Sequence, residues 1–375
     1  MSNKISIAIV GAGASGLFSA KKMSENSANQ LFLFEKSTKV GTKLKASGGG
    51  KANILNTDIQ DFHYNNAPFM SNFLQRVSSH TIQNEFMDMG LKMSVDNENR
   101  VYPSSFFSQT VLDVLLQNIS EKVTTEKEYE VTKIEPVQSQ WRINDYPVLF
   151  DKVILATGSP AGMIAANRHN YNHFLTHFSL KRSDFRPSLV GFRIKNYHRK
   201  LSGCRIKAQV TLCQNGQTIF QEKGEVIFKD DGVSGIVILN CSAYYNRLFS
   251  KSNCYLSLDL MNGEHSYNLE EHWKNHHSFC GILPPKLNEW YEQKPFDLRD
   301  LRMHIEGTYD LEMAQVCSGG IDVSELDAHL QLKKYKNIYV TGELIDIDGV
   351  CGGYNLFFAF ACAYIVAQEI NNNGN

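Results

Sequence analysis

A six-residue segment near the N-terminus, GAGASG at positions 11–16, has the spacing of a dinucleotide-binding turn. It follows an apolar run, Ile5–Val10, that predicts a strand, and it opens a stretch from 15 to 24 that is compatible with a helix. In such a turn one glycine permits the bend, one lets the backbone approach a pyrophosphate, and one lets the helix pack on the strand. The helix N-terminus adds free N–H groups. The residues that we expect at the pyrophosphate are Gly11, Gly13, Ala14, Ser15 and Gly16.

An acidic residue follows the second apolar run, which spans 31–34. Glu35 lies 19 positions beyond Gly16, where a carboxylate can accept hydrogen bonds from the hydroxyls of an adenosine ribose. The same charge repels a 2′-phosphate, so the site favours FAD or NAD over NADP. Together these segments predict one βαβ unit of a doubly wound α/β sheet.

Later segments favour FAD over NAD as the resident dinucleotide. The run VILATG predicts a strand that ends at Thr157 and Gly158, as expected where a strand meets the crevice of such a sheet. Val131, in a strand predicted at 128–134, is placed where its backbone could pair with an adenine edge. A glycine-rich turn at 342–354 then leads into an alanine-rich helix beginning near Asn355, whose positive end would stabilise the charge of a reduced flavin.

The segment from 41 to 56 is rich in glycine and too polar to be a core element, and its length indicates a binding loop. Helices are predicted at 70–89 and 110–119. Past Pro160 the pattern changes to short alternating segments with Gly, Asn or Asp turns, which predict strands at 187–194, 207–213, 217–221 and 224–228. We therefore divide the chain into 1–186 (first part of the cofactor domain), 187–263 (β-rich insertion), 264–312 (small helical subdomain) and 313–375 (second part of the cofactor domain).

Five stretches together resemble the bacterial NAD(P)/FAD-dependent oxidoreductases that include aminoacetone oxidases and a bile-acid dehydro-steroid reductase. They are GAGASG with Glu35 and Lys36, the loop GTKLKASGGGKANILNTD, FKDDGVSG, SGGID, and YVTGELIDIDGVCGGYNLFFAFACAY. The resemblance covers nearly the whole chain. It implies a Rossmann-type, glutathione-reductase-like FAD domain interrupted by a β-barrel-like domain with a small helical part. The family loop usually has GGGRCN, where this chain has Lys51 and Ala52.

The resemblance also extends the set of candidate FAD contacts, since its two most specific motifs are the glycine loop and the turn before the last helix. The turn before the last helix already supplies Gly342, Glu343, Asp348, Gly353 and Asn355 as candidates. The added candidates are Lys36, Lys43, Ser47, Gly48, Gly49, Gly50, Lys51, Asn53, Tyr354 and Leu356.

Composition points away from two classes of partner. The 38 basic and 39 acidic side chains give a net charge of −1 without a long run of one sign, so neither nucleic acid nor an anionic membrane is expected. The apolar stretch at 356–367 is too short to span a bilayer and predicts a buried helix. Eight cysteines without a CxxC pair suit thiols in a reducing cytoplasm. We expect a small-molecule substrate; the oligomeric state stays open.

Other potentially reactive side chains carry weaker signals. His272, His276 and His277 could place two imidazoles on one helix face, yet no acidic ligand accompanies them, so no metal is predicted. Cys351 lacks a resolving thiol and is interpreted as a packing residue. No catalytic residue is assigned. The side chains that could donate a proton are Glu343, His304 and Tyr354.

The sequence thus predicts an oxidoreductase in which FAD transfers two electrons between a small organic substrate and NAD(P)H or oxygen. NAD(P)H would act as a transient reductant, because only one complete fingerprint is present. The oxidase alternative is an aminoacetone or amine oxidase. Two further hypotheses are a dehydrogenase that binds NAD directly in the glycine turn, and a non-catalytic flavin sensor or RNA-associated scaffold.

Overall fold

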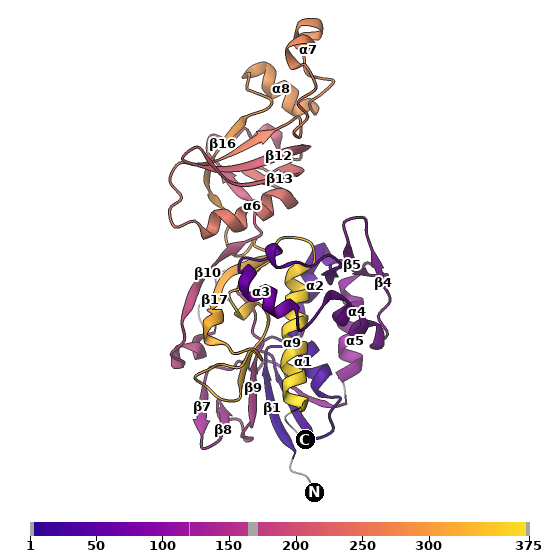
Figure 1. The fold of residues 1–375 in the computed structure, drawn as a ribbon, viewed down its shortest axis with the longest axis vertical. Coiled ribbons are helices and arrows are strands. Elements are labelled where there is room, and N and C mark those ends of the chain that lie inside the picture. The colour runs from indigo at the N-terminus through magenta and orange to yellow at the C-terminus, as the bar shows by residue number, and fades with distance from the viewer. Residues whose placement is uncertain (1–3, 120, 164–171, 373–375) are drawn as a thin grey trace. The chain divides into compact units, whose positions relative to one another are not determined.

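The computed structural model describes residues 4–119, 121–163 and 172–372. The chain forms two compact units (Figure 1). One consists of Met1–Phe185 with Gly319–Asn375 and is called the α/β unit; the other, Arg186–Ser318, is called the barrel unit. The α/β unit is therefore built from both ends of the chain.

A parallel five-stranded sheet forms the centre of the α/β unit, in the order β18–β9–β1–β2–β6. Val10 pairs with Phe34 of β2 and with Leu155 of β9, and Leu155 also pairs with Val340 of β18. The carboxyl ends of these strands thus lie at one edge of the sheet, where β1 has neighbours from different parts of the chain. This is the position at which doubly wound sheets bind ligands. The strands are β1 (Ile5–Val10), β2 (Asn29–Phe34), β6 (Val123–Glu126), β9 (Lys152–Leu155) and β18 (Ile338–Val340).

Two helices, α1 (Ala14–Met23) and α9 (Tyr354–Asn372), pack against each other beside this sheet (Figure 1). Phe18 of α1 lies 5.4 Å from Phe360 of α9 between ring centroids, and Phe86 approaches both rings, at 5.5 and 4.9 Å. Such aromatic contacts add about 0.5–1.5 kcal/mol each beyond the burial of apolar area. α9 is buried over most of its length, as its apolar sequence predicts.

Smaller elements complete the α/β unit. The helices are α2 (Thr42–Ala46), α3 (Ala67–Leu74), α4 (Ser79–Asp88) and α5 (Ser108–Ile119), with 3₁₀ turns at Ser47–Gly50, Asp61–His63 and Gly342–Leu344. The strands β3 (Leu55–Asn56), β4 (Met93–Val95) and β5 (Arg100–Pro103) form one small sheet, and β7 (Ile134–Val137) and β8 (Gln140–Ile143) form another.

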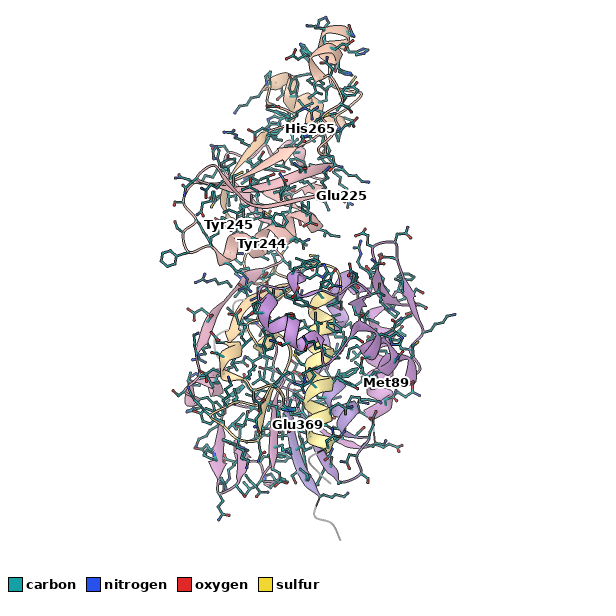
Figure 2. All side chains as sticks on the ribbon, in the orientation of Figure 1. Met89, Glu225, Tyr244, Tyr245, His265 and Glu369 are labelled. Carbon is teal, nitrogen blue, oxygen red and sulfur yellow. The ribbon has the colours of Figure 1, made fainter. Side chains whose placement is uncertain are left out.

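The barrel unit is a closed six-stranded barrel with three helices, α6 (Ile236–Arg247), α7 (Leu269–His276) and α8 (Pro285–Gln293). Figure 2 marks two neighbouring tyrosines of α6: Tyr245 is buried, 5.2 Å from Phe192, whereas Tyr244 is 41% exposed. The barrel strands, in order round the barrel, are β11 (Phe192–Ile194), β14 (Gly232–Ser234), β13 (Gln217–Phe228), β12 (Arg205–Gln214), β15 (Cys254–Asp259) and β16 (Leu301–Thr308).

The chain passes from one unit to the other along β10 (Arg182–Ser188) and returns along β17 (Val316–Ile321), and these two strands pair with each other. A Cβ atom on Gly319, where φ is 97°, would lie 2.3 Å from the Asp184 carbonyl oxygen. The close approach of exit and return strands therefore requires glycine at this position.

The predicted fold class is confirmed: a Rossmann-type α/β unit with a parallel sheet is interrupted by a closed barrel. Several predicted elements were wrong in detail. The helix expected at 70–89 is two helices, α3 and α4, and the binding loop at 41–56 contains α2. The strands expected at 217–221 and 224–228 are one continuous strand, β13. Residues 301–308, assigned to the helical subdomain, form barrel strand β16.

Among the described residues no helix combines the length and the apolar character that crossing a bilayer requires.

Candidate cofactor site

The turn between β1 and α1 contains two contacts that only glycine allows. A Cβ atom on Gly11, where φ is 106°, would lie 2.5 Å from the carbonyl oxygen of Ala156, and one on Gly16 would lie 1.9 Å from the carbonyl oxygen of Gly11. A Cβ atom on Gly13, by contrast, would meet no atom within 4 Å. The first and third glycines are therefore required by the fold, whereas the second exposes its backbone on the open side of the turn.

The N-terminus of α1 has no side-chain cap and no acidic residue in its first turn. The Leu17 N–H donates to the Gly13 carbonyl oxygen, which starts the helical hydrogen-bond ladder. The amides of Ala14, Ser15 and Gly16 are those that a helix end leaves for an external acceptor, at the positive end of the helix dipole. This arrangement suits a phosphate.

Glu35 is fixed beside the glycine turn. Its Oε2 accepts a hydrogen bond from the Ala12 N–H at 3.1 Å, and its Oε1 accepts one from the Ser37 N–H at 2.9 Å. A carboxylate has about four acceptor positions, so it retains capacity for hydroxyl donors. Lys36, the next residue, is exposed.

Val131 lies in a segment of a different shape from the one predicted. Residues 128–134 were expected to form a strand, but β6 ends before this segment and β7 begins only at its last residue. Glu128 has a φ of 56°, which a β-strand does not accommodate. The Val131 side chain is buried in the core of the α/β unit, and the nearby Tyr129 N–H donates to the Glu35 carbonyl oxygen at 3.0 Å.

A polar cluster connects the binding loop to the carboxyl ends of β9 and β18. Lys43 forms an ion pair with Glu343 and donates to Ser159 Oγ at 3.1 Å, and the Ser159 hydroxyl donates to Glu343 Oε2 at 2.8 Å. Thr157 and Gly158 immediately precede Ser159. Three segments far apart in the sequence thus meet at the sheet edge where the glycine turn begins.

Gly342 brings the end of β18 against the glycine turn. Its φ is 68°, and a Cβ atom there would lie 3.0 Å from Ser15 Oγ. The first helix and the segment leading to the last helix are therefore in direct contact.

The loop Ser47–Asn53 presents exposed backbone and one unsatisfied buried atom. Gly48, Gly49 and Gly50 all have positive φ, at 58°, 64° and 87°. Among the described residues no donor reaches the buried Oδ1 of Asn53. Leaving such an acceptor unpaired costs about 1–3 kcal/mol. The unpaired oxygen therefore indicates that a bound ligand supplies its hydrogen-bond donor. The side chain of Lys51 is exposed.

The turn before α9 packs against this loop. A Cβ atom on Gly353 would lie 2.5 Å from the Leu55 carbonyl carbon and 2.7 Å from Asn53 Oδ1. Asn355 closes the turn, because its Oδ1 accepts from the Gly349 N–H at 2.8 Å and its Nδ2 donates to the Gly349 carbonyl at 2.9 Å. Segments from both ends of the chain thus converge here.

The remaining residues of the turn are anchored to the segment 63–65. The Asp348 N–H donates to Asn65 Oδ1 at 3.0 Å, and the Tyr64 hydroxyl donates to the Tyr354 carbonyl at 3.0 Å. Leu356 is half-buried against the core of the α/β unit.

A histidine that the sequence analysis missed contacts Tyr354. The rings of His63 and Tyr354 lie 4.3 Å apart, with Nε2 3.5 Å from the Tyr354 hydroxyl. Burial lowers the pKa of His63 and raises the pKa of Tyr354 to about 12. The two residues are 291 positions apart, so no local pattern could have linked them.

The candidate residues thus form two groups. The first group comprises Gly11, Gly13, Ala14, Ser15, Gly16, Glu35, Lys43, Thr157, Gly158, Gly342 and Glu343. The second group comprises Ser47, Gly48, Gly49, Gly50, Asn53, Asp348, Gly353, Tyr354, Asn355 and Leu356. Lys36 and Lys51 lie on the surface, and Val131 lies in the core.

A separate cavity of about 630 Å³ lies within the barrel unit. Its lining includes Tyr309 and five residues of the FKDDGVSG segment: Phe228, Lys229, Asp230, Asp231 and Ser234. The Tyr309 hydroxyl donates to Asp231, and the Arg193 guanidinium stacks 4.9 Å from the Tyr309 ring.

Within the described residues no group of His, Cys, Asp and Glu side chains could hold a metal ion, and none of the eight cysteines forms a disulfide.

The sequence profile of the HI0933-like protein Rossmann domain matches residues 5–369. The chain belongs to this family of FAD-binding oxidoreductases, and it is an enzyme with oxidoreductase activity.

Two curated relatives match almost end to end. The 3-dehydro-bile acid delta(4,6)-reductase of Clostridium scindens is 26% identical over 96% of this chain and 98% of its own. The ribosomal RNA dihydrouridine synthase of Escherichia coli is also 26% identical, over 96% of this chain and 97% of its own.

Two solved structures share the fold. Escherichia coli quinol fumarate reductase is 13% identical, with a TM-score of 0.52 over 99% of this chain and 70% of the other. The 3-ketosteroid delta1-dehydrogenase of Sterolibacterium denitrificans is 12% identical, with a TM-score of 0.52 over 99% of this chain and 100% of the other.

The residues of the α/β unit fit FAD. The open backbone at Gly13 and the uncapped start of α1 suit its pyrophosphate, and the Glu35 carboxylate suits its adenosine ribose. The unpaired Asn53 Oδ1 beside Gly353 suits an N–H donor such as that of the isoalloxazine ring.

Proposed function

We propose that this enzyme reduces a carbon–carbon double bond conjugated to a carbonyl group in a small organic molecule, with NAD(P)H as the source of electrons. The observation that carries the proposal is the chemistry common to two relatives that each match over 96% of the chain. One is named as a delta(4,6)-reductase and the other as a dihydrouridine synthase, and both names describe the saturation of a carbon–carbon double bond.

In this proposal the FAD lies along the carboxyl edge of the parallel sheet. The pyrophosphate would take the amides of Ala14, Ser15 and Gly16, and Glu35 would accept the ribose hydroxyls. Asn53 and the start of α9 would hold the isoalloxazine ring, with the helix end stabilising its reduced form. The chemistry that bound FAD would supply is the transfer of two electrons from the nicotinamide to the substrate.

NAD(P)H is proposed as a transient reductant. The sequence has one complete dinucleotide fingerprint, and the α/β unit uses it at the end of β1. The nicotinamide would therefore bind briefly, without a second Rossmann turn.

We also propose that the enzyme acts in the reducing cytoplasm, which is compatible with eight cysteines that form no disulfide.

The relatives support two kinds of substrate, a free small molecule and a uracil base in RNA. We propose the small molecule, because the balanced charge of the chain provides no excess of cations for a phosphate backbone. The uracil reductase is the second candidate. It is favoured by the identity of 26% to the Escherichia coli enzyme, the same value as for the bile-acid reductase.

The first test measures the two half-reactions separately. Yellow protein would be mixed anaerobically with NADH, NADPH or aminoacetone in a stopped-flow instrument, and loss of the flavin absorbance near 450 nm would be followed. A nicotinamide should bleach the flavin. If aminoacetone alone does so, the protein is an amine oxidase; if the protein carries no flavin but turns over NAD, it is a direct dehydrogenase.

The second test offers reduced protein four oxidants: 2-cyclohexen-1-one, a 3-keto-4,6-diene steroid, unmodified ribosomal RNA and oxygen. We expect an unsaturated ketone to restore the yellow colour and to be converted to the saturated product, as mass spectrometry would show. Reoxidation by RNA, with a gain of two hydrogens in uridine, would favour the second candidate. Reoxidation by oxygen alone would overturn both reductase proposals.

A further inference from the structure

We propose that Tyr354 donates the proton in this reduction, that His63 positions its hydroxyl group, and that Phe62 borders the place where a planar substrate stacks. This inference rests on the proposed function. It assigns roles to three side chains from two distant segments, which meet at the turn before α9.

The hydrogen bonds of His63 define which ring nitrogen carries its proton. Nδ1 lies 3.0 Å from the Gln60 backbone N–H, which can only donate, so Nδ1 must be the acceptor. A neutral imidazole then carries its proton on Nε2, the atom 3.5 Å from the Tyr354 hydroxyl. His63 therefore donates to the Tyr354 oxygen and leaves the phenolic proton free to be given elsewhere. A catalytic hydrogen bond of this length often shortens when ligands bind.

The charged groups around the pair keep both members in the required state. Asp58 and Asp61 face His63, and Asp58 and Arg100 face Tyr354. Burial lowers the pKa of His63 despite the two carboxylates, so the imidazole is neutral at pH 7 and above. Burial raises the pKa of Tyr354 to about 12, so the phenol is protonated at neutral pH.

Tyr354 is also placed next to the elements that would hold the flavin. It is the first residue of α9, and it follows Gly353, which contacts Asn53. A Cβ atom on Gly352 would lie 2.9 Å from the Tyr354 ring, so the glycine is what allows the ring to lie over the turn.

The proton step balances as follows. When the β-carbon of the substrate has received its hydrogen with an electron pair that originates from NAD(P)H, an enolate remains. The O–H bond of Tyr354 then breaks, and a C–H bond forms at the α-carbon. The electron pair of the O–H bond stays on the phenolate oxygen, where the Nε2–H of His63 stabilises it. Water returns the proton to Tyr354.

Phe62 continues the aromatic stack outward. Its ring centroid lies 4.4 Å from that of His63, yet 66% of the residue is exposed. An exposed apolar ring next to a histidine and a tyrosine provides one face for a flat, partly apolar molecule such as a conjugated cyclic ketone.

The test uses full-length protein with bound FAD and compares Tyr354→Phe with a matched control, Tyr102→Phe. The control removes a hydroxyl from a half-buried tyrosine on β5. After anaerobic reduction with NADPH or dithionite, each protein would be mixed with 2-cyclohexen-1-one or the steroid. We expect Tyr354→Phe to slow reoxidation by about a hundredfold or more, while reduction by NADPH and the FAD spectrum stay as in the wild type. Tyr102→Phe should stay within about threefold.

His63 and Phe62 give smaller, distinguishable effects. His63→Leu should slow reoxidation about tenfold, and His63→Gln, whose amide can still donate, should recover most of this loss. Phe62→Ala should raise the KM for the substrate more than it lowers kcat. In wild type, reoxidation should fall at high pH as Tyr354 loses its proton, and this fall should be absent in Tyr354→Phe.

An independent readout is the ¹⁵N spectrum of histidine-labelled protein at pH 7.5, in which His63 should show the Nε2–H tautomer. An Nδ1–H tautomer, or equal reoxidation rates for Tyr354→Phe and wild type, would overturn the assignment while leaving the proposed function intact. If wild type is not reoxidised by any unsaturated carbonyl compound, the proposed function fails first, and the assignment of a proton donor fails with it.

Discussion

The two glycine turns that lead into α1 and α9 are built in different ways. In the turn at 11–16, Gly16 packs on Gly11 within six residues and the start of the helix has no side-chain cap, although Gly11 also packs against the distant Ala156 carbonyl. The turn at 349–355 is held by its own Asn355 and by Tyr64 from a distant segment, and Asn65 of that segment binds the preceding residue, Asp348. The first turn is therefore specified mainly by its own glycines, whereas the second depends more on side chains from a distant segment.

This difference determines what each glycine does. In the first turn some glycines support the fold and one faces outward, and a substitution can separate the two roles. In the second turn the groups that face the ligand lie next to the groups that support the fold. Most substitutions there should therefore change both ligand binding and stability.

The largest effect is expected for Gly16→Ala, which tests the packing role in the first turn. The new Cβ atom would lie 1.9 Å from the Gly11 carbonyl oxygen, and backbone atoms cannot move aside as a flexible side chain can. We expect a loss of about 3 kcal/mol in the free energy of unfolding, measured by urea titration of the apoprotein. An unchanged urea midpoint would contradict the predicted contact.

Gly13→Val is the counterpart, because it should damage binding and spare the fold. Gly13 has extended backbone angles, φ −85° and ψ −163°, that valine accepts, and its Cβ would meet no protein atom. We expect FAD affinity to fall at least about a hundredfold, or ~2.7 kcal/mol, in a fluorescence titration of apoprotein. The urea midpoint of the apoprotein should stay close to that of the wild type. If FAD binds normally, the open side of the turn is not the pyrophosphate site.

Asn355→Leu tests the second turn. It leaves the Gly349 N–H and carbonyl without their partner, at a cost of about 2 kcal/mol in the free energy of unfolding. FAD affinity should fall as well, since the turn loses its shape. Asn355→Asp serves as the control, because it keeps the acceptor for the Gly349 N–H and should retain part of the stability. Equal stability of Asn355→Leu and wild type would show that the turn does not depend on this side chain.

The smallest effect is a dependence of stability on pH at His63. Burial lowers the pKa of this imidazole in the folded protein below its usual value of 6.5, so the unfolded chain binds the proton more readily. The contribution of His63 is therefore fully present above about pH 6.5 and is lost as the pH falls through the lower folded pKa. We expect a few tenths of a kcal/mol, because the group is partly exposed. Urea unfolding at pH 7.5 and 5.5 should show a smaller difference in His63→Gln than in wild type.

The sequence predicts residues 5–35 of the α/β unit well, because strand, glycine turn, helix and acidic residue follow one another within this short stretch. The barrel is predicted less accurately. Gly224 indicates a break between two strands, yet β13 runs through it. The reason is tertiary: a Cβ atom on Gly224 would lie 2.9 Å from Val237, so glycine admits α6 against the strand. The start of α6, with Ile236 and Val237, has the β-branched residues of a strand and gave no helix signal.

The residues of the candidate site also divide into those that a local pattern predicts and those that only the structure brings together. Gly13 and Glu35 could be predicted because their spacing is local. Asn53 was found through the resemblance and Asn355 from the helix predicted to begin near it, and the bonding of both became visible only in the structure. His63 had no signal at all, since a single histidine in a polar stretch acquires meaning only from Tyr354, which lies 291 positions away.

The pairing of β10 with β17 has a consequence for how this architecture can diversify. Because the outgoing strand β10 and the incoming strand β17 are hydrogen-bonded neighbours, the chain enters and leaves the segment 186–318 through one pair of strands. A module attached in this way can be lengthened, trimmed or exchanged between homologues without shifting the register of the parallel sheet. Recombination at this pair of strands would exchange the barrel and leave the glycine turns of the α/β unit in place.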